Sequence, residues 1–122
     1  MSNKNLVKVA FVLEMIENIE TVCQRHKGIH EALEDVVEGR AAILMFLMQI
    51  GESLKKIDSN DISQYKLDKE IKGAYDVRNF IAHDYEGVNI MVIEEILKDN
   101  LPELKIKMQN LFDAYNKQIR VS

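Results

Sequence analysis

The sequence of 122 residues contains no tryptophan, one proline, five glycines and one cysteine. The single cysteine, Cys23, cannot form a disulfide within the chain, and its apolar neighbours indicate a core position. No apolar run approaches the roughly 20 residues that a membrane span requires, and no charged segment followed by an apolar core indicates a secretory signal. These absences predict a soluble, cytoplasmic protein that does not enter a membrane.

The chain also lacks an excess of basic residues. Sixteen lysines and arginines stand against 20 acidic residues, which gives a formal net charge of -4. Non-specific nucleic-acid binding depends on a basic face that neutralises phosphates, so the composition argues against a nucleic-acid coat protein. One candidate for a small local basic strip consists of Lys66, Lys69, Lys72 and Arg78. A solvated helix face explains the three lysines better.

The apolar residues, 47% of the chain, recur at helical spacing, and no segment alternates as a strand would. The first expected helix follows Asn3 as its N-cap and ends near Gly28. The other expected helices cover residues 29–57, about 67–83, 90–97 and 102–119, with residues 58–61 as a loop. The predicted fold is all-α: one domain over residues 1–122, an antiparallel bundle of four long helices plus a shorter fifth.

Three residues stand out in the expected helix over residues 29–57. Arg40 interrupts an otherwise apolar stripe, so it must reach an edge, pair with a carboxylate or lie at a subunit interface. Gly51 costs about 1 kcal/mol relative to alanine in a helix interior, which predicts the close approach of another helix. Glu52 follows it and could pair with Arg78 or Arg40, with a structural ion pair as the favoured role.

The stretch RNFIAHDY, residues 78–85, concentrates polar residues at the end of an expected helix. Asn79 and His83 are four residues apart and share a helix face, whereas Arg78 lies about 140° around the helix from His83. Histidine can take or give a proton near neutral pH, and arginine offers a planar fork of donors that matches a phosphate. Together these side chains suit cleavage of an RNA phosphodiester by the adjacent 2′-hydroxyl, without a metal ion.

This reaction needs both an acid and a base, which a single histidine cannot easily supply. Two copies across a twofold axis would supply two histidines and two arginines, so the pattern favours a homodimer with a composite site, if the protein is an enzyme. The same residues can instead have a purely structural role. A histidine near a helix C-terminus can satisfy the helix dipole, and Arg78 can pair with a nearby acid such as Asp76 or Asp84.

His26 and His30 have the spacing of two metal ligands on one helix. Gly28 lies between them at an expected helix break, and no third ligand is evident nearby. We therefore interpret both as surface histidines, and no metal site is predicted.

In this stretch, Arg78 and Asn79 are followed after three residues by His83, and after one more residue by Tyr85. This pattern resembles the R-x4-H-x-Y signature of HepT-like proteins of the HEPN superfamily. The similarity extends over most of residues 40–112. Its flanking segments, in the family's order, are residues 40–42, 50–52, 84–89 and 101–104. The resemblance implies an HEPN-like helical domain and a homodimeric, metal-independent ribonuclease toxin of a type VII toxin–antitoxin pair, with no cofactor and with mRNA or tRNA as substrate.

The resemblance also implies roles for individual residues. Arg78 and His83 would be catalytic, and Asn79 would help to shape the site. Tyr85 matches the tyrosine that a partner minimal nucleotidyltransferase antitoxin modifies with AMP, which would add negative charge and bulk beside His83. Candidate supporting residues are Glu52, Arg40 and Asp84.

Two other classes of function stay open at the level of the sequence. One is a non-catalytic subunit that binds a nucleotide or another substrate and pairs with a nucleotidyltransferase. The other is a purely structural helical dimer, in which the motif is only a helix cap and a salt bridge.

Overall fold

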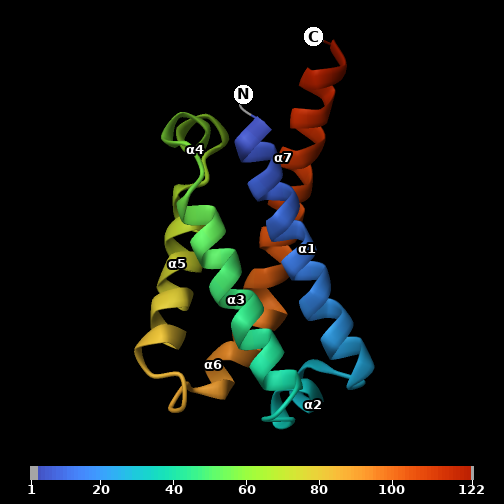
Figure 1. The fold of residues 1–122 in the computed structure, drawn as a ribbon, viewed down its shortest axis with the longest axis vertical. Helices are drawn as coiled ribbons and strands as arrows, with labels where there is room; N and C mark the ends of the chain where they lie inside the picture. Colours follow the sequence, from blue (N-terminus) through green and yellow to red (C-terminus); the bar gives the residue numbers. More distant parts are fainter. Residues whose placement is uncertain (1–2, 122) are drawn as a thin grey trace.

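Four long helices form the framework of the fold (Figure 1). They are α1 (Asn3–Arg25), α3 (Gly39–Lys55), α5 (Asp68–His83) and α7 (Leu101–Val121). The computed structural model describes residues 3–121, and this part of the chain contains no strand. Successive long helices run in opposite directions, so the expected all-α antiparallel bundle is confirmed. The side chain of Asn3, expected as an N-cap, lies outside the described side chains.

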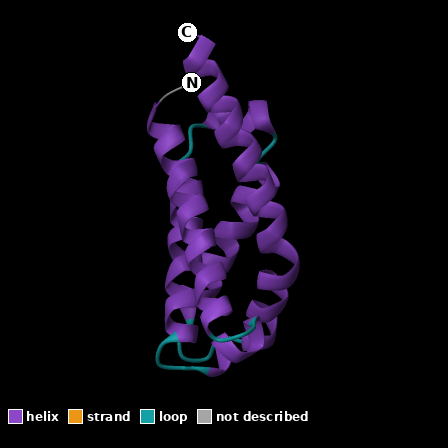
Figure 2. Ribbon diagram, turned by 90° about the vertical axis from the view of Figure 1, so that its right-hand side faces the viewer, coloured by secondary structure: helices purple, strands orange, loops and turns teal. Residues whose placement is uncertain are grey.

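Short helices connect the long ones at both ends of the bundle. They are α2 (Ile29–Glu34), α4 (Ser59–Tyr65) and α6 (Ile90–Glu95). Figure 2 shows the loops gathered at these same two ends, with uninterrupted helix between them. The turn that follows α5 therefore lies beside α6, at the end of the bundle opposite to α4.

The core follows the seams where α3 packs against α1 and α5, and where α1 packs against α7. Fully buried side chains from all four long helices meet there, including Ile16, Ile43, Leu54, Ile81 and Met108. Burial of one such side chain stabilises the folded state by roughly 1.5–3 kcal/mol. The apolar stripes read from the sequence thus form one connected cluster.

The expected continuous helix over residues 29–57 is wrong at its centre. The chain leaves the helical conformation after Glu34 and resumes it at Gly39, which leaves Val36 58% exposed instead of in the core. A Cβ on Gly39 would lie 2.2 Å from the carbonyl oxygen of Ala32. The break therefore folds α2 back against the start of α3, and only a residue without a side chain fits there.

Arg40 joins the two helices that this break creates. Its Nε–H donates to the carbonyl oxygen of Leu33 at 2.8 Å, near the C-terminal end of α2. Helix ends leave carbonyls without a partner in the helix, so this bond satisfies one of them. The arginine within the apolar stripe is explained by the attachment of α2 to α3.

The expected loop over residues 58–61 is wrong as well, because α4 begins at Ser59. The carboxylate of Asp58 accepts the N–H of Asn60 at 2.8 Å and so caps the helix. The buried side chain of Asp61 accepts a hydrogen bond from Asn5, which docks α4 on α1. A run of aspartate, serine and asparagine is as typical of a helix cap as of a loop.

The helix expected from Pro102 is observed as α7, which begins at Leu101, but α6 leads into it without a loop. The two are joined by a π-helical turn, η1 (Ile96–Asn100), and the N–H of Leu101 donates to the carbonyl of Ile96. Proline has no N–H, and in a regular α-helix its ring collides with the carbonyl four residues earlier. The wider π turn lets the helical path pass this proline without a break.

Around the motif, the observed helix bounds and helix cap agree with those expected from the sequence. The helix expected over about 67–83 is observed as α5, residues 68–83. Asn89 caps α6 as expected, because its side chain accepts the N–H of Met91 at 3.0 Å. The RNFIAHDY motif therefore occupies the last turns of α5 and the start of the turn that leads to α6.

Candidate active site

Gly51 brings α3 and α5 into close contact at the level of the motif. A Cβ on Gly51 would lie 2.6 Å from the carbonyl oxygen of Ala74 and 2.7 Å from Cβ of Arg78. The close helix approach predicted from this glycine is confirmed. Its consequence for the site is that Glu52, the next residue, lies directly beside Arg78.

The guanidinium of Arg78 is held by two neighbouring side chains. Its Nε–H and an Nη2–H donate to Oε1 of Glu52 at 3.1 and 2.9 Å, and an Nη1–H donates to Oδ1 of Asn79 at 3.1 Å. A guanidinium carries five N–H groups, so two remain, one on each Nη nitrogen. Two such N–H groups are what a phosphate accepts in a bidentate contact.

The acids nearest to Arg78 in sequence have other partners. Asp76 pairs with Lys72 at 2.9 Å, one helical turn earlier. Asp84 accepts the backbone N–H of Gly87 at 3.0 Å, which fixes the turn after α5. The pairing of Arg78 with Asp76 or Asp84 that the structural interpretation suggested is therefore wrong, and the partner is Glu52.

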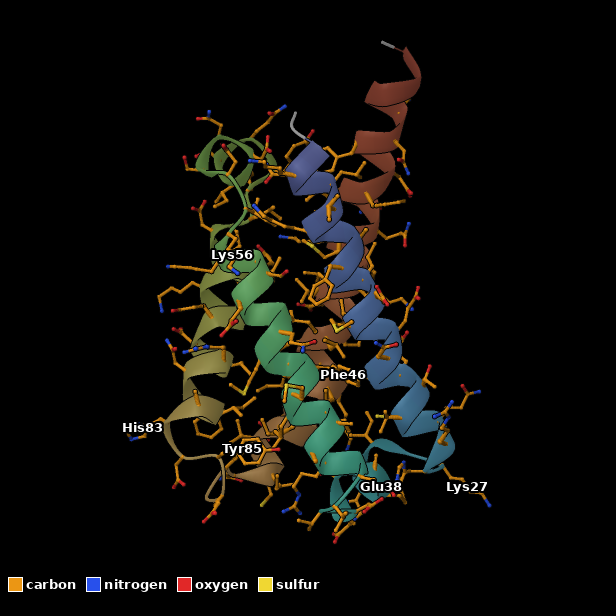
Figure 3. The ribbon with its side chains drawn as sticks, in the orientation of Figure 1. Lys27, Glu38, Phe46, Lys56, His83 and Tyr85 are labelled. Carbon is orange, nitrogen blue, oxygen red and sulfur yellow. The ribbon has the colours of Figure 1, made fainter. Side chains whose placement is uncertain are left out.

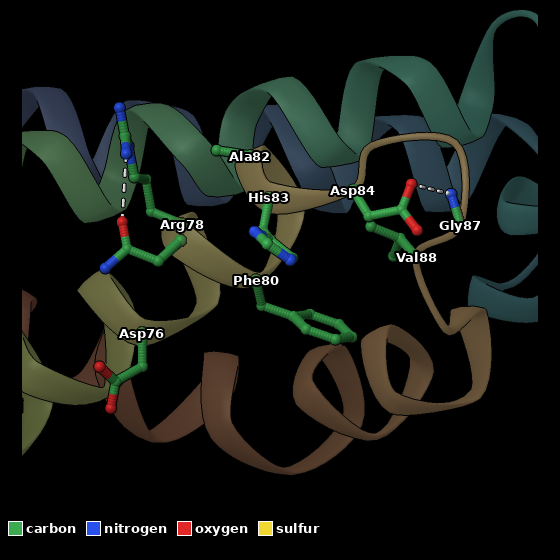
Figure 4. Close-up of a pocket in the computed structure, with 9 residues that line it drawn as sticks. Asp76, Arg78, Phe80, Ala82, His83, Asp84, Gly87 and Val88 are labelled. Atoms are coloured by element: carbon green, nitrogen blue, oxygen red, sulfur yellow. Dashed lines mark hydrogen bonds between the residues drawn. The ribbon is translucent and has the colours of Figure 1, made fainter.

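His83 is the last residue of α5, and its side chain is exposed. Within the described part of the chain it forms no hydrogen bond or ion pair, so both ring nitrogens are available. It lines an open depression of about 760 Å³ on the outer face of α5 and the following turn (Figure 4). The other main lining residues are Arg78, Asn79, Phe80, Asp84 and Val88.

Arg78 and His83 point in different directions, although both contribute to this depression. Figure 4 shows the guanidinium directed away from the imidazole. The helix stays regular through His83, so the angular separation expected from the spacing is retained. One copy of the chain therefore does not bring the arginine fork and the histidine ring onto one point.

Tyr85 lies apart from His83, although only Asp84 separates them in sequence. The tyrosine is 46% exposed and does not line the depression. Figure 3 shows His83 projecting outward from the end of α5, whereas Tyr85 lies on the side of the turn nearer α3 and α6. The side chain is accessible, but in a single copy it is not packed against the histidine.

The three candidate supporting residues separate in the same way. Glu52 contacts Arg78, and Asp84 shapes the turn that follows His83. Arg40 is bound to Leu33 at the junction of α2 and α3, and it does not line the depression. The structure thus brings Glu52 and Asp84 to the motif, but not Arg40.

The sequence reasoning missed one cation beside the motif. The Nζ of Lys55 lies 4.8 Å from the centroid of the Tyr75 ring, and Cζ of Arg78 lies 5.8 Å from the same centroid. Lys55 follows Glu52 by one helical turn, and Tyr75 precedes Arg78 by one turn. Once Glu52 and Arg78 are known to meet across two antiparallel helices, this second contact follows from their register.

The remaining histidines take part in structural contacts. His26 lies within hydrogen-bond distance of the Val22 carbonyl and of Asp35, at 2.8 and 2.9 Å, and His30 lies beside Glu34. Among the described residues, no group of three or more histidine, cysteine, aspartate or glutamate side chains could hold a metal ion. The helices of this part of the chain include none that is long and apolar enough to cross a membrane.

The chain matches a known protein family. A family model described as ribonuclease HepT-like matches residues 12–111, which include the whole motif and the α3–α5 contact. A search of curated proteins found no match. A search of solved structures found none either.

Proposed function

Because the chain belongs to the HepT-like ribonuclease family, we propose that it is a metal-independent endoribonuclease and the toxin of a type VII toxin–antitoxin pair. The observation that carries this proposal is the arrangement of Arg78. Glu52 and Asn79 hold three of its N–H groups, and the two that remain can bind an RNA phosphate. His83, exposed at the end of the same helix, is free to transfer protons.

The proposed reaction is an internal phosphoryl transfer within RNA. The 2′-hydroxyl oxygen attacks the adjacent phosphorus, while the bond from phosphorus to the 5′-oxygen of the next nucleotide breaks. A base takes the proton of the 2′-hydroxyl, and an acid gives a proton to the departing 5′-oxygen, which leaves a 2′,3′-cyclic phosphate. Arg78 would stabilise the charge that develops on the phosphate oxygens, and His83 would transfer protons.

The different directions of Arg78 and His83 support a homodimeric site. A twofold axis beside the end of α5 would let the histidine of one copy face the arginine of its partner, and would supply two histidines for the acid and the base. The surface around His83 is partly apolar, because Phe80 is 39% exposed and lies with Val88 in the same depression. A partner copy would cover this apolar surface.

Tyr85 is the proposed regulatory position. Its side chain is accessible at the turn after α5. There a nucleotidyltransferase antitoxin could transfer AMP from ATP to the hydroxyl oxygen, with loss of the hydroxyl proton and release of pyrophosphate. The added phosphate and nucleoside would place negative charge and bulk close to the expected path of the RNA. In the proposed dimer this group would repel RNA from both copies of the site.

RNA cleavage in EDTA tests the proposed activity. Purified wild-type protein, with intact mass showing an unmodified Tyr85, should produce cyclic phosphate ends, and Arg78→Ala and His83→Ala should not. Arg25→Ala and His30→Ala are matched controls, since both residues are exposed and lie outside the motif. Absence of cleavage by the unmodified wild-type protein would contradict the proposal.

A non-catalytic binding subunit of a nucleotidyltransferase is the second candidate. It is favoured by the fact that one copy alone presents the phosphate-binding fork of Arg78 but directs His83 elsewhere. RNA or nucleotide binding that depends on Arg78 but not on His83, without any cleavage, would support this candidate over the ribonuclease.

A further inference from the structure

We propose that Lys55 and Tyr75 form a second phosphate subsite, which holds the RNA strand beside the phosphate bound by Arg78. The inference rests on the proposed ribonuclease function, and it extends that function to how the substrate is placed. The two cations share one aromatic ring. The centroid of the Tyr75 ring lies 4.8 Å from Nζ of Lys55 and 5.8 Å from Cζ of Arg78.

The register of α3 and α5 puts the subsite on the same surface as the site. Glu52 and Lys55 are three residues apart on α3, and Tyr75 and Arg78 are three residues apart on α5. Residues at this spacing lie one above the other on a helix face. The contact of Glu52 with Arg78 and that of Lys55 with Tyr75 are therefore successive steps along one seam between the helices.

The distances set the length of RNA that the two cations can contact. Because both lie against one ring, the ammonium of Lys55 and the guanidinium carbon of Arg78 cannot be farther apart than the sum of their distances to its centroid. Phosphates of adjacent nucleotides on one strand are separated by less than this limit. One strand can therefore place one phosphate on each cation.

The charges along the seam point to an anion at Lys55. The charge of Arg78 is largely balanced by Glu52, whereas Lys55 is exposed and forms no ion pair within the described residues. Lys72, another cation of α5, is neutralised by Asp76. The seam beside Tyr75 thus carries net positive charge in a chain whose formal net charge is -4. Such local charge attracts a polyanion where the chain as a whole does not.

Tyr75 fits the role of a platform for the two cations. The ring is half-buried, so its position is fixed by the packing of α5 on α3, and both cations lie within contact distance of it. The three donors of the lysine ammonium are not used by a carboxylate of the described chain. A phosphate oxygen can accept from them without displacing an existing ion pair.

The test is the salt dependence of binding to a 2′-O-methyl RNA oligonucleotide, which has no 2′-hydroxyl to attack and is not cleaved. We expect Lys55→Gln to weaken binding and to reduce the slope of log K against log salt by about 0.7, the value for one phosphate contact on a single strand. Lys56→Gln, which removes the same charge from the next residue, should keep the wild-type slope. Tyr75→Phe should retain binding, and Tyr75→Leu should weaken it.

Cleavage kinetics separate this subsite from a mere effect on Arg78. Lys55→Gln should raise KM for a long RNA more than KM for a dinucleotide, because a dinucleotide does not reach the subsite. A wild-type slope and KM in Lys55→Gln would overturn the subsite, even with full ribonuclease activity. Oligonucleotide binding that depends on Lys55 in a protein that cleaves no RNA would instead overturn the ribonuclease and keep the subsite.

Discussion

The two ends of the candidate site are built in different ways. On the α3–α5 seam, Arg78 is fixed by Glu52 and Asn79 and lies against the ring of Tyr75. At the end of α5, His83 is exposed and has no hydrogen-bond partner in the described chain. The phosphate-binding group is thus pre-organised within one copy, whereas the proton-transferring group is left open. This difference is what a site completed by a second copy would require.

Mixing two inactive variants tests this difference between Arg78 and His83 with the largest expected effect. His83→Ala should lower kcat for RNA by roughly 10²–10⁴, the usual contribution of a positioned acid or base. Arg78→Ala should lower it by roughly 10²–10³, as for the loss of one group that stabilises transition-state charge. If the arginine of one copy acts together with the histidine of its partner, a mixed dimer of the two variants keeps one such pair across the axis, although it lacks the second histidine. We expect partial recovery of cleavage on mixing, measured with co-expressed, differently tagged chains.

The control for this experiment is the homodimer of the double variant, which has no intact site in any arrangement. Cleavage by the mixed dimers that is no higher than by this control would show that one pair of Arg78 and His83 across the twofold axis does not support cleavage. The expected cooperation of one arginine with the partner's histidine would then be wrong, while the assignment of Arg78 and His83 would be unaffected.

Glu52 tests whether pre-organisation of Arg78 matters for the reaction. Glu52→Ala should lower kcat by up to about 10²-fold, because the guanidinium loses the partner that orients it. The same change should change stability little, since an exposed ion pair contributes about 0–1 kcal/mol. Kinetics together with thermal unfolding measure both effects. A faster enzyme would show instead that Glu52 competes with the phosphate for Arg78.

The close contact of α3 and α5 can be tested with two glycines that differ in their surroundings. Gly51→Ala should destabilise the fold by about 1–3 kcal/mol, because the added methyl group would overlap Ala74 and Arg78. Gly73→Ala is the matched control, since nothing lies within 4 Å of a Cβ at that position of α5. It should stabilise the helix by about 0.4–1 kcal/mol. Chemical denaturation measures both, and equal effects would contradict the seam geometry.

The sequence predicted the local features of the site, but of the side-chain contacts between its two helices it offered only the pairing of Glu52 with Arg78 or Arg40, of which the first is observed. The spacing of Asn79 and His83, the cap at Asn89 and the close approach at Gly51 follow from a single helix pattern, and the structure agrees with each of them. The contact of Lys55 with Tyr75 depends on the register of α3 against α5, which no pattern within one helix sets.

The fold likewise has features that follow from one helix and features that depend on how the backbone of neighbouring segments packs. The apolar stripe over residues 29–57 continues across the break before Gly39, so spacing alone could not locate it. The break depends on the backbone of α2 folding back on α3, where the oxygen of Ala32 excludes a side chain. The π turn before Pro102 is likewise a response of the backbone to one residue, and it leaves the apolar spacing unchanged.

The smallest expected effect is on thermal stability and concerns His26, which has hydrogen-bond partners where His83 has none among the described residues. The side-chain contact with Asp35, followed by the Val22 carbonyl, raises the pKa of His26 above its usual value. Both ring nitrogens face acceptors, so the protonated ring, with two donors, fits best. The His26 contact also holds the pKa of Asp35 below its ordinary value.

The sign of the pH effect follows from these two shifts. The stability that His26 contributes is fully present below the pKa of a free histidine, near 6.5, and is lost as the pH rises through the raised folded pKa. The contribution of Asp35 is present above about pH 4 and is lost as the pH falls through its lowered folded pKa. The Tm of the wild type should therefore exceed that of His26→Gln most between pH 4 and 6.5, and the difference should shrink above that range. His30→Gln is the control, and an advantage that grew with rising pH would show that His26 is held in its neutral form.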